Sequence, residues 1–233
     1  MSEQILPDNL PIPEDDGACD HLEGMNFPPL FVESTNGSIN LAELPMTTVV
    51  YIYPRSSADV VDPEGWDAIP GARGCSPQGC AFRDHQSELL ALDASVFGLS
   101  TQDIPYLQSE VARLHLPFSL ISDSNLQLKK ELNIPLLEMK LDDVSLYKRI
   151  TLIIRKGRIV KVFYPVFPPD KNAENEFNQA ISWLSLAYAD YHWFMVLPGS
   201  HLGAFGNHSG DLASDLSSAV INLKRVSDLL NDG

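Results

Sequence analysis

Short apolar segments alternate with amphipathic helical segments along most of this 233-residue chain, and this alternation restricts the possible folds more than any other feature. The segment TTVVYIYP at 47–54 is β-branched and aromatic without polar alternation, which is typical of a central strand buried on both faces. The pattern predicts an α/β domain with a central mixed sheet flanked by helices. Strands are expected at 95–101, 117–123, 148–157 and 158–166, and helices at 75–92, 102–116, 125–134 and 172–189.

Turn and cap residues support this arrangement at its two ends. Asn36 and Gly37 lie between two strand-like runs in 28–44, and an Asn-Gly pair is a strong signal for a tight hairpin. We therefore expect an N-terminal hairpin. Asn172 precedes the helical pattern at 172–189 and is interpreted as its N-cap.

Changes in composition divide the chain into three parts. Residues 1–23 are polar and rich in proline and acidic residues, so they are interpreted as an N-terminal extension. Residues 24–189 contain the alternating pattern. Residues 190–233 are interpreted as a C-terminal helical extension, because leucine and valine recur there at helical spacing in a terminal amphipathic helix.

The charge of the chain excludes several classes of partner. Sixteen Lys and Arg residues against 31 Asp and Glu residues give a formal charge of -15, which repels nucleic-acid phosphates and anionic membranes. The most apolar stretch, 181–197, is interrupted by Asp190 and His192, so no membrane span is predicted. The acidic N-terminus lacks the basic start and apolar run of a secretory signal, and we expect a cytoplasmic protein.

Three cysteines are too few for a disulfide-stapled scaffold. Cys19 stands among acidic residues, which disfavour its thiolate, and is interpreted as a bystander. Cys75 follows a glycine-rich turn at the start of a helical pattern, where unpaired N–H groups and the helix dipole stabilise a thiolate. The nearby Arg73 and Arg83 should act in the same direction. Cys75 is therefore a candidate nucleophile, and the alternative is a small buried cysteine that only packs.

The spacing of Cys75 and Cys80 suggests a conformational switch. On one regular helix the two residues are about 7.5 Å apart in rise and about 140° apart in rotation, too far for a disulfide. They can join only if the first turn unwinds, and Pro77 and Gly79 weaken that turn. A zinc site built from the two cysteines and His85 is the competing interpretation, but the spacing is unusual and no fourth ligand stands nearby. We predict no metal.

An ordered set of segments between about residues 20 and 184 resembles the peroxiredoxins, specifically the peroxiredoxin Q or bacterioferritin-comigratory-protein-like group. The segments are VVYIYP, GCSPQGCAFRDH, VFGLST, LPFSLISD and KRITLIIRKGRIVKVFYPVFP. The resemblance implies a thioredoxin-like fold and a thiol peroxidase that needs no cofactor. It also implies a hydroperoxide substrate and a thioredoxin-like reductant. We expect a monomer or a homodimer.

The resemblance also assigns roles to individual residues. Cys75 matches the peroxidatic cysteine and Cys80 the resolving cysteine of the same chain, so that the two would form an intramolecular disulfide. Arg149 matches the arginine that holds the thiolate. Pro54 matches the proline that closes the strand before the active-site loop, and Pro54 and Gly74 are assigned to substrate binding.

One position departs from the family pattern. Ala72 stands where the family usually has Thr, less often Ser, whose hydroxyl would bond the thiolate and the peroxide. Ser76, Arg73 or a backbone amide are the groups that could replace it. The departure keeps two alternatives open. One is a redox sensor without efficient turnover, and the other is a disulfide oxidoreductase of the same fold, although the C-x-x-C spacing of such enzymes is absent.

Overall fold

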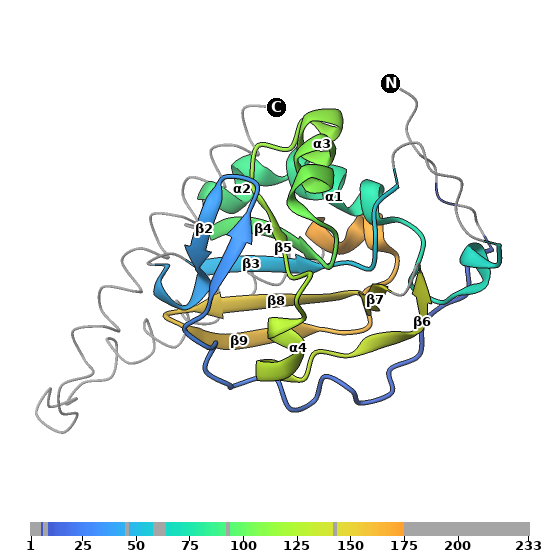
Figure 1. Cartoon of the computed structure of the whole chain (residues 1–233), viewed down its shortest axis with the longest axis horizontal. Helices are drawn as coiled ribbons and strands as arrows, with labels where there is room; N and C mark the ends of the chain where they lie inside the picture. The colour runs from blue at the N-terminus through green and yellow to red at the C-terminus, as the bar shows by residue number, and fades with distance from the viewer. Residues whose placement is uncertain are drawn as a thin grey trace, which may run out of the picture. The chain divides into compact units, whose positions relative to one another are not determined.

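The computed structural model describes residue 6 and residues 9–44, 47–57, 64–91, 94–141 and 144–174 (Figure 1). The chain divides into two compact units. The first consists of Met1–Gln86 and Ala94–Ala173, and the second of Ser87–Asp93 and Glu174–Gly233. Of the second unit, only 87–91 and Glu174 are described, and α2 (Gln86–Ala91) begins at the boundary between the units.

A seven-stranded mixed sheet forms the centre of the first unit, with the strand order β2-β1-β5-β4-β3-β8-β9. The central strand β3 is parallel to β4 and antiparallel to β8, and its last five residues are all buried. This confirms the prediction of a central strand covered on both faces. The strands are β1 (Phe31–Ser34), β2 (Gly37–Asn40), β3 (Thr47–Ile52), β4 (Ala94–Ser100), β5 (Leu120–Ser122), β8 (Ile150–Arg155) and β9 (Arg158–Phe163).

The hairpin expected near the N-terminus is present, since β1 and β2 pair antiparallel. Ser34 lies opposite Gly37, so the connecting residues are Thr35 and Asn36, one position earlier than the predicted Asn36–Gly37 turn. Gly37 has a φ of 97°, in the region that glycine adopts without strain, which explains its place at this turn. A second hairpin, β6 (Leu136–Leu141) and β7 (Val144–Tyr147), forms a separate two-stranded sheet. The sequence pattern did not predict this second hairpin.

Alternation along β3 separates two layers that cover the sheet. Tyr51 stacks on Phe82 of α1 (Cys75–Asp84), with ring centroids 4.6 Å apart. The neighbouring Ile52 belongs to the cluster that includes Leu128 of α4 (Gln127–Leu132). Helix α3 (Ile104–Leu114) contacts α1, and the two are adjacent in Figure 1. The expected α/β sheet flanked by helices is therefore confirmed.

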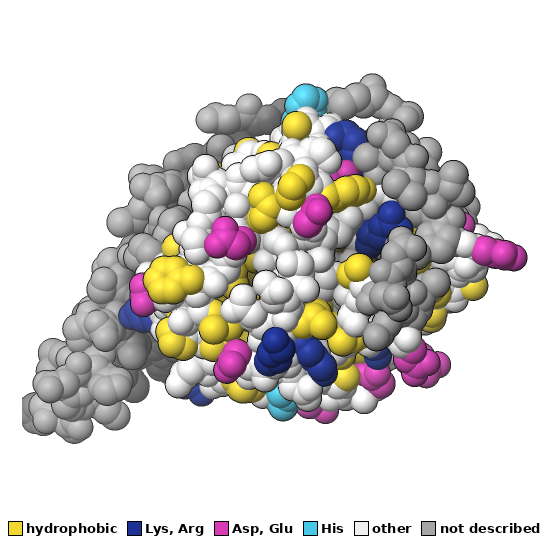
Figure 2. Space-filling view, viewed as in Figure 1, with side chains coloured by type: hydrophobic (Ala, Val, Ile, Leu, Met, Phe, Trp, Pro, Cys, Tyr) yellow, Lys and Arg dark blue, Asp and Glu magenta, His cyan; other side chains and the backbone are white. Residues whose placement is uncertain are grey.

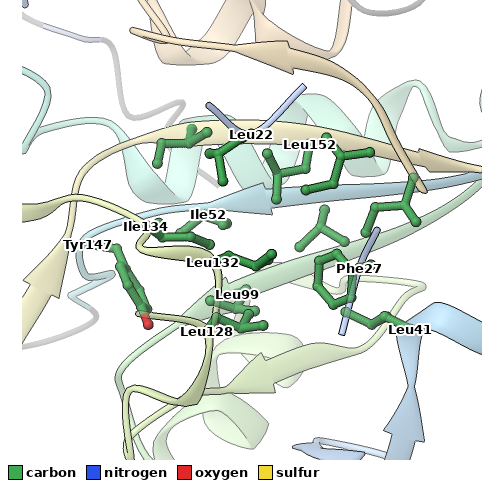
Figure 3. Close-up of a cluster of buried hydrophobic side chains, with 14 of the residues drawn as sticks. Leu22, Phe27, Leu41, Ile52, Leu99, Leu128, Leu132, Ile134, Tyr147 and Leu152 are labelled. Atoms are coloured by element: carbon green, nitrogen blue, oxygen red, sulfur yellow. The ribbon is translucent and has the colours of Figure 1, made fainter. Parts of the chain in front are cut away.

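The main core lies on the α4 side of the sheet (Figure 3). Leu22 and Phe27, from the segment before β1, are almost fully buried in it beside strand residues such as Leu99 and Leu152. Burying apolar side chains of this size contributes about 1.5–3 kcal/mol each. The segment that holds Leu22 is therefore part of the folded unit, although the sequence analysis placed it in an extension.

Aspartate side chains, one exposed and one buried, cap helices α3 and α4. Asp103 accepts a hydrogen bond from the Tyr106 amide at the start of α3. Asp123 accepts from the amides of Gln127 and Leu128, which satisfies donors at the start of α4. These caps explain why both helices begin where they do.

Two details of the predicted helices are wrong. The helix expected over 75–92 ends at Asp84, because His85 adopts φ -97° and ψ 10°, and α2 then starts at Gln86. Asn172 is not an N-cap: its backbone is helical, and it follows the short helix η3 (Pro169–Lys171). Its side chain accepts hydrogen bonds from other side chains instead. The rest of the predicted helix at 172–189 and the C-terminal extension lie outside the described residues.

On the face that Figure 2 shows, the described Lys and Arg side chains lie interspersed with Asp and Glu. Among the described helices, none has both the length and the apolar character needed to cross a bilayer.

Candidate active site around Cys75

Cys75 is the first residue of α1, and a tight backbone turn places it there. The preceding Gly74 has a φ of 98°, which favours glycine because a side chain would be strained. A Cβ built on Gly74 would also lie 2.3 Å from Cγ of Pro169. Gly74 thus lets the chain turn into the helix while it packs directly against η3.

The Cys75 sulfur is buried next to a cation. Nη2 of Arg149 lies 3.1 Å from Sγ of Cys75, and the thiol donates to the Ala72 carbonyl at 3.6 Å. Cys75 is 7% exposed and Arg149 is 3% exposed. Because water screens this pair little, the guanidinium and the start of the helix together place a strong positive potential at this sulfur.

Sheet register explains how Arg149, 74 residues away in sequence, reaches Cys75. Strand β8 runs antiparallel to β3, and Ile150 pairs with Ile52. The start of β8 and the end of β3 therefore meet at the same edge of the sheet. Arg149 precedes β8 at this edge, and Pro54 follows β3 there.

The Arg149 guanidinium is held by several acceptors at once. It donates to three backbone carbonyls of the turn before Cys75: Gly71 at 3.2 Å, Ala72 at 3.3 Å and Arg73 at 3.0 Å. Nη1 donates to Oε1 of Gln78. Because the planar guanidinium donates to several acceptors at once, its orientation is fixed, and so is the position of its positive charge.

Gln78 connects this guanidinium to the end of the described chain. It is fully buried, and its Nε2 donates to Oδ1 of Asn172 at 2.7 Å. The same oxygen accepts from Oγ1 of Thr151 at 2.8 Å. Sequence reasoning missed these three residues. The position of Gln78, three residues after Cys75 in a helix, could have indicated a side chain on the same face, whereas only the fold brings Asn172 and Thr151 to it.

Cys80 lies on the same helix as Cys75, and both are free thiols. Cys80 is partly exposed, and its pKa is raised, chiefly by burial of the thiol. The guanidinium groups of Arg83 and Arg113 oppose this rise. The helical spacing that the sequence analysis assumed for the two cysteines is therefore present, and a disulfide between them requires the first turn to unwind.

The loop after Pro54 is hydrogen-bonded to the segment that connects β4 to α3. Pro54 is buried, and the Tyr53 amide before it donates to the Leu99 carbonyl at 3.0 Å. The Ser56 amide donates to Oε1 of Gln102 at 3.0 Å. Burial raises the pKa of Tyr53, and the nearby Cys75 sulfur adds to this rise, so Tyr53, the residue after β3, lies close to Cys75.

The two arginines that lie near Cys75 in sequence, Arg73 and Arg83, each form an ion pair with a carboxylate. Nε of Arg73 forms an ion pair with Asp67 at 2.8 Å. Arg83 pairs with Asp84 at 2.8 Å, toward the C-terminal end of α1. The guanidinium on the Cys75 sulfur comes from Arg149, the residue to which the family resemblance assigned this role.

Position 72 has an apolar environment in this chain. Ala72 is fully buried in a cluster with Trp66 of the short helix η2 (Trp66–Ala68) and Leu146 of β7. Its carbonyl, rather than a side-chain hydroxyl, bonds the thiol and Arg149. The hydroxyl of Ser76 accepts from Arg113 of α3 at 3.0 Å and is therefore engaged on the α3 side of the helix.

The third cysteine lies away from these residues, in the main core. Cys19 is 4% exposed, and burial raises its pKa to about 12, with a further contribution from the carboxylates of Asp16 and Asp15. A thiol with such a pKa is a poor nucleophile at neutral pH. Among the described residues, no group of three or more His, Cys, Asp or Glu side chains is placed to hold a metal ion.

Comparisons with known proteins agree with this arrangement. The family model described as Redoxin matches residues 22–181. The chloroplastic peroxiredoxin Q of Populus jackii is 30% identical over 129 residues, which cover 54% of this chain and 51% of that protein. The chloroplastic peroxiredoxin Q of Sedum lineare is 27% identical over 157 residues, which cover 65% and 74%. The chain thus spans about half the length of the first of these relatives.

Two solved structures share the fold. A PrxQ mutant from Xylella fastidiosa has a TM-score of 0.58 and 22% identity, and the match covers 70% of this chain and 98% of that one. Peroxidoxin BcpB from Mycobacterium tuberculosis has a TM-score of 0.57 and 19% identity, with the same coverage. The fold is thioredoxin-like, as the resemblance implied. Because the Redoxin model covers more than half of its residues, the chain belongs to the Redoxin family and is peroxiredoxin Q-like.

Proposed function

We propose that this chain is a thiol peroxidase in which Cys75 reduces hydrogen peroxide and organic hydroperoxides. The observation that carries the proposal is the 3.1 Å contact between Nη2 of Arg149 and Sγ of Cys75 at the start of α1. A buried sulfur with a fixed cation and a helix N-terminus is an activated nucleophile.

In the proposed first step, the Cys75 thiolate attacks one oxygen of the hydroperoxide and the O–O bond breaks. The sulfur is oxidised to a sulfenic acid, and the peroxide is reduced to water or an alcohol after it takes up a proton. The Arg149 guanidinium, held by Gln78 and the backbone carbonyls, stabilises the negative charge that moves from sulfur to oxygen. Pro54 and Gly74 would border the bound peroxide.

In the second step, the Cys80 sulfur attacks the sulfenic sulfur of Cys75. A disulfide forms and water leaves, once the first turn of α1 has unwound. An external dithiol of the thioredoxin kind would then reduce this disulfide by exchange. The cytoplasmic location and the monomeric or homodimeric state remain predictions.

Intact mass after one equivalent of hydrogen peroxide tests the proposal. We expect a loss of about 2 Da, mapped by digestion to Cys75 and Cys80. Cys80→Ser should stop at a single sulfenate, and Cys75→Ser should abolish peroxide consumption. Cys19→Ser is the matched control and should behave as the wild type. Equal loss of the first oxidation event in the Cys75 and Cys80 variants would contradict the assigned roles.

The apolar surroundings of Ala72 favour one alternative, a redox sensor that is oxidised without efficient turnover. Peroxide consumption coupled to a thioredoxin and its reductase separates the two. Many turnovers per chain support the peroxidase, whereas oxidation that stops at one equivalent supports the sensor.

A further inference from the structure

Helix α3 places a second guanidinium against the first turn of α1, in contact with Ser76. Nη2 of Arg113 donates to Oγ of Ser76 at 3.0 Å. The same arginine donates through Nε and Nη2 to the carboxylate of Glu110, at 3.0 Å and 2.8 Å. Glu110 is fully buried, although a buried carboxylate is costly unless it is paired. The proposed peroxidase steps use neither Glu110 nor Arg113.

The buried carboxylate makes Arg113 a rigid group. Arg113 is one turn after Glu110 on α3, and its side chain is 31% exposed. Removing the guanidinium from Glu110 would leave an unpaired charge in the interior, so Arg113 remains beside α1. Its contact with Ser76 is a charge-assisted hydrogen bond between two helices, and such bonds are stronger than neutral ones.

Ser76 lies within the segment that has to move. Cys75 and Cys80 can form a disulfide only if the turn between them unwinds, and Ser76 is in that turn. Unwinding must therefore break the bond from Arg113 to Ser76. The other polar anchor in this turn, Gln78, also holds Arg149, so a change there affects the Cys75 sulfur as well.

We propose that Arg113, fixed by the buried carboxylate of Glu110, is a positioning residue that latches the first turn of α1 through Ser76 and so limits the rate at which Cys80 captures oxidised Cys75. This inference rests on the proposed peroxidase function. The latch acts on the second step only, because its contacts lie on the α3 side of the helix and not on Arg149.

The latch from Arg113 to Ser76 affects how the Cys75 sulfenic acid partitions between two competing reactions. Capture by the Cys80 thiol forms the disulfide and releases water. Attack of the sulfenate on a second hydroperoxide instead breaks another O–O bond, oxidises the sulfur to sulfinic acid and releases water or an alcohol. A tighter latch leaves the sulfenate exposed to the second reaction for longer.

Ser76→Ala is the cleanest test, because it removes the hydrogen-bond acceptor and leaves the Arg113–Glu110 pair intact. It also keeps the Arg113 charge near Cys80, where this charge opposes the rise in the Cys80 pKa. Substitution of Arg113 would remove both the hydrogen bond to Ser76 and the positive charge near Cys80, and it would leave the Glu110 carboxylate unpaired. Ser76→Thr keeps the hydroxyl and serves as the rescue variant. Ser109→Ala is the matched control, since Ser109 is exposed on α3 and bonds within that helix, to the Tyr106 carbonyl.

Rapid quenching after one equivalent of hydrogen peroxide gives the rates of sulfenate and disulfide formation separately. In Ser76→Ala we expect disulfide formation to be about three- to tenfold faster, with the rate of sulfenate formation unchanged. At excess peroxide, the fraction of chains with a sulfinic acid, a gain of about 32 Da, should fall by a similar factor. Ser76→Thr and Ser109→Ala should match the wild type.

Two results would overturn the latch. One is an unchanged rate of disulfide formation in Ser76→Ala, and the other is an equal change in the rate of sulfenate formation, which would place Ser76 at the reacting atoms. Either result counts against the latch only when the wild-type chain forms the disulfide between Cys75 and Cys80. A wild-type chain that forms none refutes the proposed function instead, so the two failures are distinguishable.

Discussion

Nη2 of Arg149 lies 3.1 Å from the sulfur of Cys75, and both side chains are buried. This contact joins two segments that are 74 residues apart in sequence. It combines a permanent positive charge with the N-terminus of α1 at one sulfur. The site therefore depends on sheet register as much as on the cysteine motif.

Replacing Arg149 should slow the first oxidation step. Arg149→Gln keeps hydrogen-bonding groups but loses the charge, so we expect sulfenate formation to slow by roughly 100-fold, as when one preorganised donor is removed. Stopped-flow measurement of peroxide reduction gives this rate. Arg155→Gln, an exposed arginine at the other end of β8, is the control and should change the rate little. Equal effects of the two substitutions would show that Arg149 acts only through the net charge of the chain.

Asn172 should contribute to stability through two buried hydrogen bonds. In Asn172→Leu, the donors of Gln78 and Thr151 lose their common acceptor, and the free energy of unfolding should fall by about 2–4 kcal/mol. Urea denaturation measures this change. Adding Thr151→Val removes one of the stranded donors, so the double variant should recover part of the loss. A double variant less stable than Asn172→Leu would contradict this account of the cluster.

Gly74 should tolerate substitution worse than Gly37, a glycine with nearly the same φ whose Cβ position is open. Gly37 has a φ of 97°, and no described atom lies within 4 Å of the position that its Cβ would take, whereas a Cβ on Gly74 meets Pro169 at 2.3 Å. Gly37→Ala measures the backbone strain alone, about 1 kcal/mol. Gly74→Ala should cost a further 1–3 kcal/mol, roughly the penalty of overpacking. Similar midpoints in urea denaturation for the two variants would rule out the steric contribution of Pro169.

Cys19 should make the stability of the protein depend on alkaline pH. Its thiol has a pKa of about 12 in the folded chain, raised from 9.0 by burial and by the nearby carboxylates. Between these values the folded state keeps a proton that the unfolded state loses, so stability falls as the pH rises through this range. In Cys19→Ala this contribution is absent, and the decline of the unfolding free energy with pH should be shallower than in the wild type. Parallel curves for the two proteins would contradict burial of the thiol.

The amino-acid sequence by itself determined the α/β architecture and pointed to Cys75 as the candidate nucleophile. Apolar periodicity predicted the central strand β3 and the alternation of strands and helices, because local side-chain patterns must match a buried sheet. The Asn36–Gly37 pair predicted a hairpin, because few residues adopt its backbone conformation. The spacing of Cys75 and Cys80 on one helix was likewise a local property.

Only the tertiary structure decided what surrounds the sulfur. The family resemblance assigned Arg149 to Cys75, but local sequence offered only Arg73 and Arg83, and the register of β8 against β3 is what brings Arg149 to the sulfur. The contact of Gln78 with Asn172 and that of Ser76 with Arg113 join segments far apart in the chain. Sequence spacing carries no information about such pairs, because they depend on how the helices and the sheet pack and not on local backbone preference.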